Sequence, residues 1–398
     1  MLSVKVCVIT FHFVNNFGGA LQAYALQKAI SDNCNAECEV IDYRNWFIRF
    51  TDTVRLFPVT GNVKEIGTGL KTMGKRVGRL NKFKKFISEN CTLTEVYGSR
   101  MKMKSHPPKA DKYVCGSDQI WNPVLTMGVS PNYFLGFVEN PDDKIAYAPS
   151  FGKDTMSASN KKKVKQYLES FGHLSVREQS GQKMIKDMTG RDAEQLIDPT
   201  FLIDKKDWEA LAVTPDIKEK YILLYIMQKD DEVYEYARKM KEKLGIKLVE
   251  ISRYGYNPGF VDETLIDVGP REFLGLFRDA AYVCTNSFHG LAYSVIFEKD
   301  FCLIPCKRFT TRIDNMRKLL HIEANANLND ENSLTAVYDK EYVKSIIKGE
   351  REKAIRYLKK AFWNKYIVLK WQITNRKITE VYKCQKLCQK WLMYVSSC

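Results

Sequence analysis

The sequence of 398 residues predicts an α/β protein built from two doubly wound, Rossmann-like domains and a basic helical tail. Short β-branched, apolar segments alternate with segments of helical periodicity, which is typical of parallel βαβ units. This alternation restarts after residues 198–200. The chain is also longer than the roughly 250 to 300 residues at which single cores stop growing. We therefore expect domains at residues 1–200 and 201–345, followed by a tail at 346–398.

The first domain is expected to begin with a strand, a turn and a helix. Residues 4–10 are apolar and β-branched, residues 15–19 have turn chemistry, and residues 20–30 have a helical apolar repeat. Further strands are predicted at 39–43, 112–115, 144–149 and 173–176. Residues 61–110 are rich in basic residues and glycine and carry few strand signals, so we expect a basic insertion of helical pieces and loops there.

The second domain repeats the pattern of strands and helices. Strands are predicted at 221–227, 247–251, 282–284 and 301–304, and helices at 232–244, 271–277 and 288–297. Open parallel sheets bind ligands beyond the carboxyl ends of their strands. Residues that follow directly after these strands are therefore the first candidates for a functional site.

The positive charge is concentrated in two segments. The chain has 62 Lys and Arg against 47 Asp and Glu, a net charge of +15. Residues 351–398 hold 12 basic and 2 acidic residues, and residues 61–110 hold 12 and 3, so the other 300 residues sum to −4. This distribution predicts contact with anionic ligands or surfaces at particular places. Nucleic acid is not an expected partner, because no recognised nucleic-acid module is present.

Cysteine usage and hydropathy indicate a cytoplasmic protein. Eleven cysteines are scattered along the chain without an export signal, and we expect reduced thiols and no metal site. The longest aliphatic stretches fall far short of the roughly 18 residues that a membrane-spanning helix needs. The tail, which mixes basic and aromatic residues, has two open interpretations. It can rest on the anionic inner face of the cytoplasmic membrane or pack on the first domain, and both can hold at once if the basic and aromatic side chains occupy opposite faces of one helix.

Two candidate positions follow strands of the first sheet. Gly18 and Gly19 lie where the first strand turns into a helix, and backbone N–H groups at a helix start can hold an anion. The alternative is that these glycines only allow close packing. Ser117 and Asp118 follow the strand at 112–115, where a carboxylate can reach into a cleft, although Asp118 could equally be a helix cap.

Two more candidates are an arginine and a histidine. Arg177 follows the strand at 173–176 and could bind a carboxylate or phosphate, or form a surface pair with Glu178. His289 follows Asn286 and Ser287 and falls in the first turn of a predicted helix. The helix dipole there disfavours the imidazolium and keeps the ring neutral, ready to exchange a proton. A packed or capping histidine is the alternative.

The ordered set of motifs resembles the polysaccharide pyruvyl transferase family. The matching segments are FGGALQAYAL at 17–26, GSDQIWNP at 116–123, AYAPSFG at 146–152, SVRE at 175–178 and SFHG at 287–290. The resemblance implies a two-domain fold like that of the GT-B glycosyltransferases, with phosphoenolpyruvate (PEP) as donor substrate in the cleft and no cofactor. It also implies transfer of the enolpyruvyl group to two hydroxyls of one sugar, which forms a ketal and releases phosphate. The sugar acceptor, which we expect to be lipid-linked, belongs to surface polysaccharide synthesis.

The resemblance places Asp118, Arg177 and His289 in the cleft, with one departure from the family pattern. Many relatives have arginine two places before the histidine, where this sequence has Ser287. The nearest replacement cations in sequence are Lys307, Arg308 and Arg312. Two alternatives stay open from the residues alone: a GT-B glycosyltransferase that uses a nucleotide sugar, and a binding protein without catalysis.

Overall fold

The first half of the molecule is built on a parallel sheet of five strands. The computed structural model describes residues 3–54, 67, 71–227, 231–305, 310–324 and 326–363. The strands of the first sheet are β1 (Val4–Ile9), β2 (Ala36–Tyr43), β3 (Leu93–Tyr97), β4 (Lys112–Cys115) and β5 (Lys144–Ala146). Their order is β3-β2-β1-β4-β5, and every pair is parallel.

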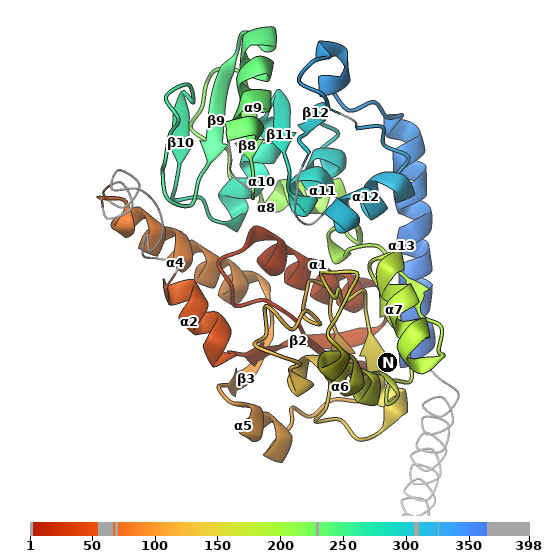
Figure 1. Ribbon diagram of the computed structural model, residues 1–398. Coiled ribbons are helices and arrows are strands. Elements are labelled where there is room, and N and C mark those ends of the chain that lie inside the picture. The colour runs from red at the N-terminus through yellow and green to blue at the C-terminus, as the bar shows by residue number, and fades with distance from the viewer. Residues whose placement is uncertain are drawn as a thin grey trace, which may run out of the picture.

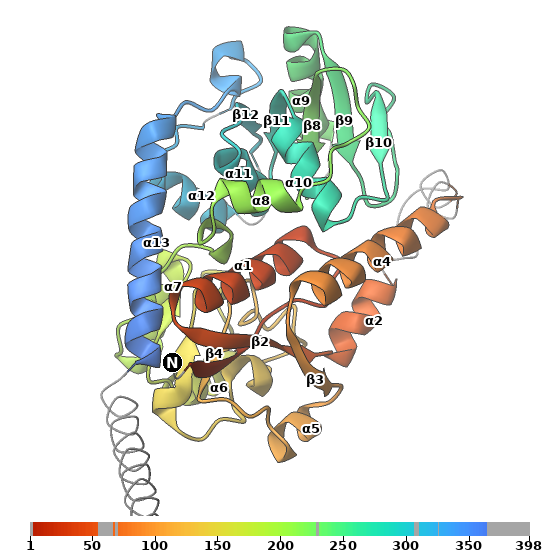
Figure 2. The same cartoon turned by 180° about the vertical axis from the view of Figure 1, so that it is seen from behind.

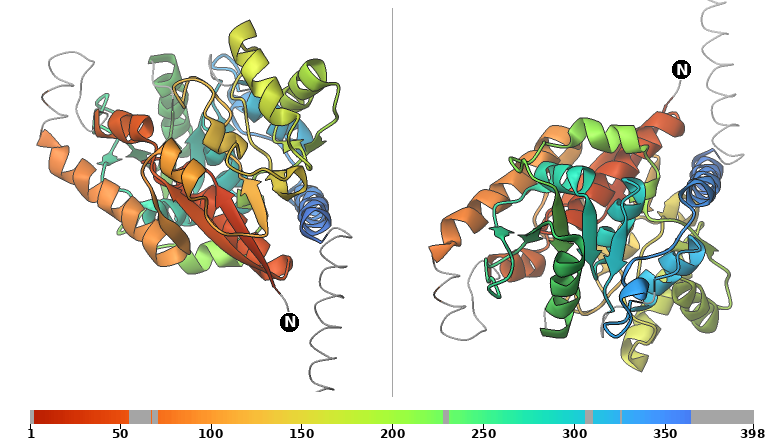
Figure 3. Two further views of the ribbon diagram at one scale, coloured as in Figure 1. Left: turned by 90° about the horizontal axis from the view of Figure 1, so that it is seen from below. Right: turned by 90° about the horizontal axis from the view of Figure 1, so that it is seen from above.

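The second half repeats this topology. Its strands are β8 (Tyr221–Tyr225), β9 (Lys247–Ile251), β10 (Glu263–Leu265), β11 (Tyr282–Thr285) and β12 (Phe301–Leu303). Their order is β10-β9-β8-β11-β12, again with parallel pairs only. In Figure 1 this sheet lies above the first one. Figure 3 shows the molecule from below, with the first half toward the viewer, and from above, with the second half toward the viewer. The predicted fold class of two doubly wound halves is confirmed.

Helices cover both sheets and fill the space between them. They are α1 (Phe17–Asn33), α2 (Trp46–Val54), α4 (Met73–Asn90), α5 (Arg100–Ser105), α6 (Ala158–Leu168), α7 (Gln179–Thr189), α8 (Lys205–Leu211), α9 (Asp231–Leu244), α10 (Pro270–Asp279), α11 (Phe288–Ile296), α12 (Thr310–Leu319) and α13 (Lys340–Phe362). Helix α1 lies between the two halves (Figure 1), and 12 of its 17 residues are buried. Its side chains are apolar nearly all round because α1 packs on its own sheet and on α10 of the second half, where Phe17 stacks on Phe273 at 4.2 Å.

The structure corrects two expectations for the first half. The segment at 61–110 is more than helical pieces and loops, because it supplies β3, which pairs with β2. This strand has a weak apolar signal because it lies at the sheet edge with Glu95 and Val96 exposed. Residues 173–176 do not form one strand of the main sheet, because only His173 bridges to it, in parallel with Ile145 of β5. They contribute the short strand β6 (Ser175–Val176), which pairs with β7 (Glu194–Gln195) in a separate two-stranded sheet.

Helix α13 runs along one side of the molecule from the second half to the first (Figure 2). The Arg351 guanidinium donates hydrogen bonds to the carbonyls of Phe201 and Ile203, and the Tyr357 hydroxyl donates to that of Ala146 at 2.8 Å. The described part of the predicted tail therefore packs on the protein. The remaining residues, 364–398, lie outside the described part of the chain. Among the described helices, none is long and apolar enough to cross a membrane.

Candidate functional site

The site lies where the turn before α1 in the first half meets the turn before α11 in the second half. In the first half, the Asn16 side chain caps α1 by accepting a hydrogen bond from the Gly19 N–H at 3.2 Å. In the second half, the Thr285 hydroxyl donates to the Tyr225 carbonyl at 2.6 Å and accepts from the Ser287 N–H at 3.1 Å. These bonds fix the turn that leads from β11 into α11. The starts of α1 and α11 are thereby held in place.

Gly18 and His289 are in direct contact across the two halves. A Cβ atom placed on Gly18 would lie 2.1 Å from both Cε1 and Nδ1 of His289, far inside contact distance. Gly19 has its tightest neighbour in Val14, 2.7 Å from its Cβ position, and the Asp118 carboxylate lies at 3.6 Å, an ordinary contact distance. The two glycines thus bring the imidazole and a carboxylate onto the first turn of α1. This is the close-packing role that the sequence left open for them.

Asp198 connects the predicted residues to one another. Its Oδ2 accepts hydrogen bonds from Arg177 at 2.7 Å and from the Ser117 hydroxyl at 3.3 Å, and it lies 3.9 Å from Nε2 of His289. Its Oδ1 accepts from the N–H and hydroxyl of Thr200. Burial opposes ionisation, yet His289, Arg177 and the Thr200 N–H together lower the pKa of Asp198. Sequence analysis used residues 198–200 only as a domain boundary and missed this role.

Arg177 is buried and already engaged by two carboxylates. Besides Asp198, its Nε donates to Glu178 at 2.9 Å, and its guanidinium lies 4.4 Å from the ring centre of Phe288. Burial works against the charge, but Glu178, Asp198 and Asp118 outweigh it and raise the pKa of Arg177. Its Nη2 is buried and has no hydrogen-bond partner within the described ranges. The Arg177–Glu178 pair is therefore buried, and the Nη2 amino group of Arg177 is left to bind a ligand.

His289 is held in its neutral form. Burial lowers its pKa, and the positive charges of Arg177 and Arg312 act in the same direction against Asp198 and Asp118. Its Nε2 is buried and makes no hydrogen bond to any described residue. A neutral ring with an open nitrogen can take up a proton. The expectation of a neutral histidine at the helix start agrees with this pKa direction, and burial is its largest cause.

The remaining predicted residues lie around this centre. Asp118 has a φ of +70° in the turn after β4, and its Oδ1 accepts from the Gln119 N–H at 2.8 Å. With the Gln119 amide oriented to satisfy its neighbours, its oxygen accepts from Nη1 of Arg312 at 3.1 Å. The Asn286 side chain accepts from the Met227 N–H at 2.7 Å. Lys307 and Arg308 fall outside the described residues.

The space at the site is small. Arg177, Glu178, Asp198, Phe288 and Arg312 are among the residues that line a pocket of about 20 Å³, which has room for one or two water molecules. In the described part of the chain, no three His, Cys, Asp or Glu side chains cluster as metal ligands would.

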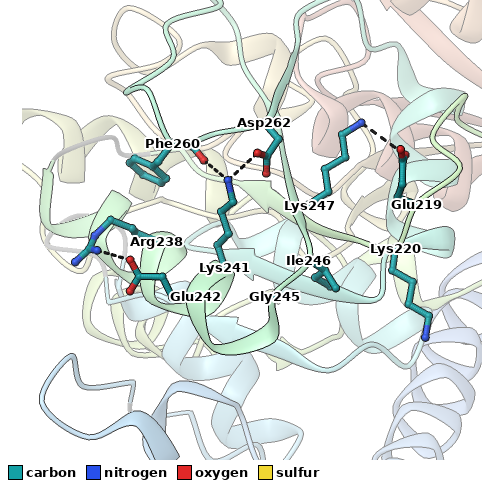
Figure 4. A pocket seen from close by; sticks show the side chains of 10 residues that line it. All are labelled: Glu219, Lys220, Arg238, Lys241, Glu242, Gly245, Ile246, Lys247, Phe260 and Asp262. Atoms are coloured by element: carbon teal, nitrogen blue, oxygen red, sulfur yellow. Dashed lines mark hydrogen bonds and ion pairs between the residues drawn. The ribbon is translucent and has the colours of Figure 1, made fainter.

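A second pocket lies away from this cluster and is a poor candidate. It has a volume of about 880 Å³ and lies where β8 and β9 begin, with Lys241, Lys247 and Asp262 among its lining residues (Figure 4). Its charged side chains are paired with each other, as Lys241 is with Asp262 at 2.7 Å and Arg238 with Glu242. Ligand sites of open parallel sheets lie at the carboxyl ends of strands. We therefore place the candidate site at the polar residues around His289 and not at this pocket.

A sequence profile described as polysaccharide pyruvyl transferase matches residues 16–308. The chain belongs to this family. The match contains the turn at Gly18, the Asp118 and Arg177 segments, Asp198 and the His289 helix, and it ends four residues before Arg312. No curated protein matches the sequence of this pyruvyl transferase family member.

Several solved structures are distantly similar to this polysaccharide pyruvyl transferase. A UDP-GlcNAc 2-epimerase from Neisseria meningitidis bound to UDP-GlcNAc has 9% identity and a TM-score of 0.43, covering 93% of this chain and 100% of its own. The glycosyltransferase SnogD from Streptomyces nogalater has 13% identity and a TM-score of 0.39, covering 90% and 95%. An alpha-glucosyltransferase in complex with UDP has 9% identity and a TM-score of 0.46, covering 94% and 99%. These likenesses are too remote to carry an argument about function.

Proposed function

We propose that this protein transfers the pyruvyl group of PEP to two hydroxyls of one sugar and forms a cyclic ketal. The observation that supports this most directly is the convergence of His289, Asp118, Asp198 and Arg177 at the contact between the two halves. In the reaction, C2 of PEP forms bonds to two hydroxyl oxygens and its bond to the phosphate oxygen breaks. Carbon C3 gains one proton, and the second hydroxyl proton leaves with the phosphate.

His289 and Asp118 are proposed to move these protons as a pair. The first hydroxyl must lose its proton as it attacks C2, and a neutral imidazole or a carboxylate can accept it. His289 has an open Nε2 and a lowered pKa, which suit it for this step. A bound donor with up to three negative charges raises the pKa of the imidazole again, because an opposite charge favours the imidazolium. The proton can then be delivered to the C3 methylene.

The donor's negative charge needs cationic hydrogen-bond donors. We propose that Arg177, through its open Nη2, and Arg312 contact the donor, with the N–H groups at the start of α11 beside them. Of the three basic residues that the sequence suggested, Lys307, Arg308 and Arg312, this proposal uses only Arg312. The acceptor is proposed to be a lipid-linked sugar of surface polysaccharide synthesis, which would be met at the inner face of the membrane.

The test is pyruvylation by the purified full chain. We expect phosphate release from PEP with one member of a panel of lipid-linked galactose- or mannose-type acceptors, and a ketal in the product by mass spectrometry. His289→Ala should lower turnover by about 100-fold or more, since general acid–base groups contribute about 10² to 10⁴. The control is His106→Ala, because His106 is exposed at the end of α5. Consumption of a nucleotide sugar instead of PEP would contradict the proposal.

A further inference from the structure

Two arginines meet at the turn that precedes α1, next to the catalytic cluster. Arg79 of α4 donates from Nε to the Asn15 side-chain oxygen at 3.0 Å, and Arg253, just after β9, donates from Nη2 to the Asn15 carbonyl at 2.9 Å. One arginine comes from each half of the molecule. Neither forms an ion pair with an acidic residue in the described part of the chain, which sets them apart from Arg177.

Burial makes the positive charge of the Arg79 guanidinium energetically unfavourable. Its side chain is only 6% exposed, and its guanidinium lies 4.7 Å from the ring centre of Phe17. Burial and then the neighbouring positive charge of Arg253 lower the pKa of Arg79 to about 10, against the opposing effects of Tyr225 and Asp267. A buried cation without a carboxylate is unfavourable unless an anion completes the site. The ring contact offsets only part of this cost.

Neutral hydroxyl groups border the two arginines on the side of the catalytic cluster. Burial raises the pKa of Tyr225, while Arg79, a hydrogen bond with Ser287 and Arg253 oppose the rise. Tyr225 is therefore close to both arginines and to Ser287. Ser287 is the N-cap of α11, and its hydroxyl makes no capping hydrogen bond. His289 follows two residues later, so this surface adjoins the proton-transferring group.

The residues around His289 and the pair Arg79 and Arg253 differ in net charge. Around His289, the two positive charges of Arg177 and Arg312 face three carboxylates, Asp118, Glu178 and Asp198, which gives −1. That cluster alone cannot balance a phosphate-bearing substrate. Arg79 and Arg253 carry +2. Asp267 also acts on the charge of Arg79, but it pairs with Lys82 at 3.4 Å. A phosphate monoester or diphosphate carries a charge that matches the two arginines.

We propose that Arg79 and Arg253, with Ser287 and Tyr225, form a subsite that binds a phosphate group of a substrate. The inference rests on the proposed function, and it names the residues that would bind the negative charge of the substrate. The phosphate belongs either to PEP or to a diphosphate that links the acceptor sugar to its carrier. Because the subsite uses one arginine from each half, the bound phosphate also holds the two halves together.

The test is calorimetric titration of the full chain with PEP and, separately, with inorganic pyrophosphate as a probe for a diphosphate. Arg253→Gln and Arg79→Gln should each weaken binding of at least one probe by roughly 10- to 100-fold, the usual effect of losing a charge-assisted hydrogen bond. The control is Lys75→Gln, which removes the same charge from an exposed position of α4. It should change affinity less than about twofold, because exposed charges are screened.

The outcomes separate the two sources of phosphate. Weaker binding of PEP alone assigns the subsite to the donor, and weaker binding of pyrophosphate alone assigns it to the acceptor. Unchanged affinity for both probes in folded Arg253→Gln overturns the inference, as does a wild-type chain that binds neither probe. Arg253 is only partly buried, so its variant remains informative if Arg79→Gln does not fold. Arginine-dependent phosphate binding without ketal formation would instead refute the proposed function and leave the subsite standing.

Discussion

The contact between Gly18 and His289 makes the site sensitive to a single methyl group. In Gly18→Ala the new Cβ would lie 2.1 Å from the imidazole, so the ring has to shift. Displacing a catalytic group by about 1 Å can cost roughly 100-fold in rate. We expect Gly18→Ala to lower turnover by about that factor while the chain stays folded, as measured by steady-state kinetics and circular dichroism.

Gly74 provides a matched control for this variant. Each of these glycines is the second residue of its helix, and no atom lies within 4 Å of a Cβ placed on Gly74. Gly74→Ala should therefore leave turnover unchanged and raise the free energy of unfolding by about 0.5 to 1 kcal/mol, because alanine loses less backbone entropy. Normal turnover in Gly18→Ala would show that the position of the ring is not critical.

The lowered pKa of His289 predicts how stability depends on pH. Above the unfolded pKa of about 6.5, His289 is neutral in both states and contributes no pH dependence. As pH falls below that value, the unfolded chain binds a proton that folded His289 resists, so the native state loses stability. The loss continues down to the folded pKa, and each unit of depression corresponds to about 1.4 kcal/mol.

The measurement is urea unfolding of wild type and His289→Asn at pH 7 and pH 5. The free energy of unfolding should fall more for the wild type than for the variant between these values. The pKa of His173 is also lowered, mainly by burial, but His173 is present in both proteins and cancels in the difference. Asp198 contributes at lower pH, because its stabilising ionisation is lost only below about 4. An equal fall in the free energy of unfolding of both proteins between pH 7 and pH 5 would show that His289 does not resist protonation.

Individual site residues were predictable where a strand end marked them. Asp118, Arg177 and His289 each follow an apolar segment directly, and the structure brings all three together. Asp198 and Arg79 carried no such mark. Asp198 follows no strand of either main sheet, and Arg79 lies within a run of basic residues that looks solvent-exposed. Their roles arise from contacts with residues far away in sequence, which a single sequence does not reveal.

At the scale of elements, buried strands and α1 agreed with their sequence patterns, while edges and insertions did not. Strand β3 was missed because an edge strand needs only one buried face, and Tyr97 is its only buried residue. Helix α4 was expected only as part of an insertion. Its buried residues, Arg76, Arg79, Phe83, Phe86 and Ile87, recur at helical spacing, so the pattern was present but its charges obscured it.

Helix α4 also explains how an arginine from the first half reaches the second. Lys82, one turn after Arg79, donates to the Asp267 carbonyl at 2.7 Å and pairs with Glu272 at 3.0 Å. These contacts anchor the helix on the second half. The element that supplies the proposed phosphate subsite is thus also a connection between the halves.

For the whole molecule, topology repeats although the sequence does not. Both sheets have the same order of five strands, and in each half the strand that comes first in the chain is central. Apolar periodicity was enough to predict two α/β halves, because the central strands β1 and β8 are almost entirely buried. The relative placement of the halves was not predictable from periodicity. It depends on α1, α4 and α13, which contact both halves through specific side chains.

The last prediction concerns how the whole molecule meets a lipid-linked acceptor. Residues 340–363 pack on the protein, and Trp363 donates from Nε1 to the Cys34 carbonyl at 3.0 Å. Packing and membrane binding are compatible, because Lys359 and Lys360 of α13 are exposed and the basic charge continues in residues 364–398. This segment has seven basic residues and one acidic residue together with Trp371 and Trp391. Basic residues near an anionic surface contribute about 1 kcal/mol each, and tryptophan settles among the lipid headgroups.

We therefore expect the full chain to sediment with vesicles that contain anionic lipid at low salt and to be released at high salt, since salt screens the attraction. A chain that ends at Trp363 should stay in the supernatant under both conditions, because it keeps α13 and its contacts but lacks the basic segment. Vesicles of neutral lipid control for non-specific adsorption. If the full chain stays in the supernatant at low salt, the tail does not bind membranes, and the acceptor must be presented by another route.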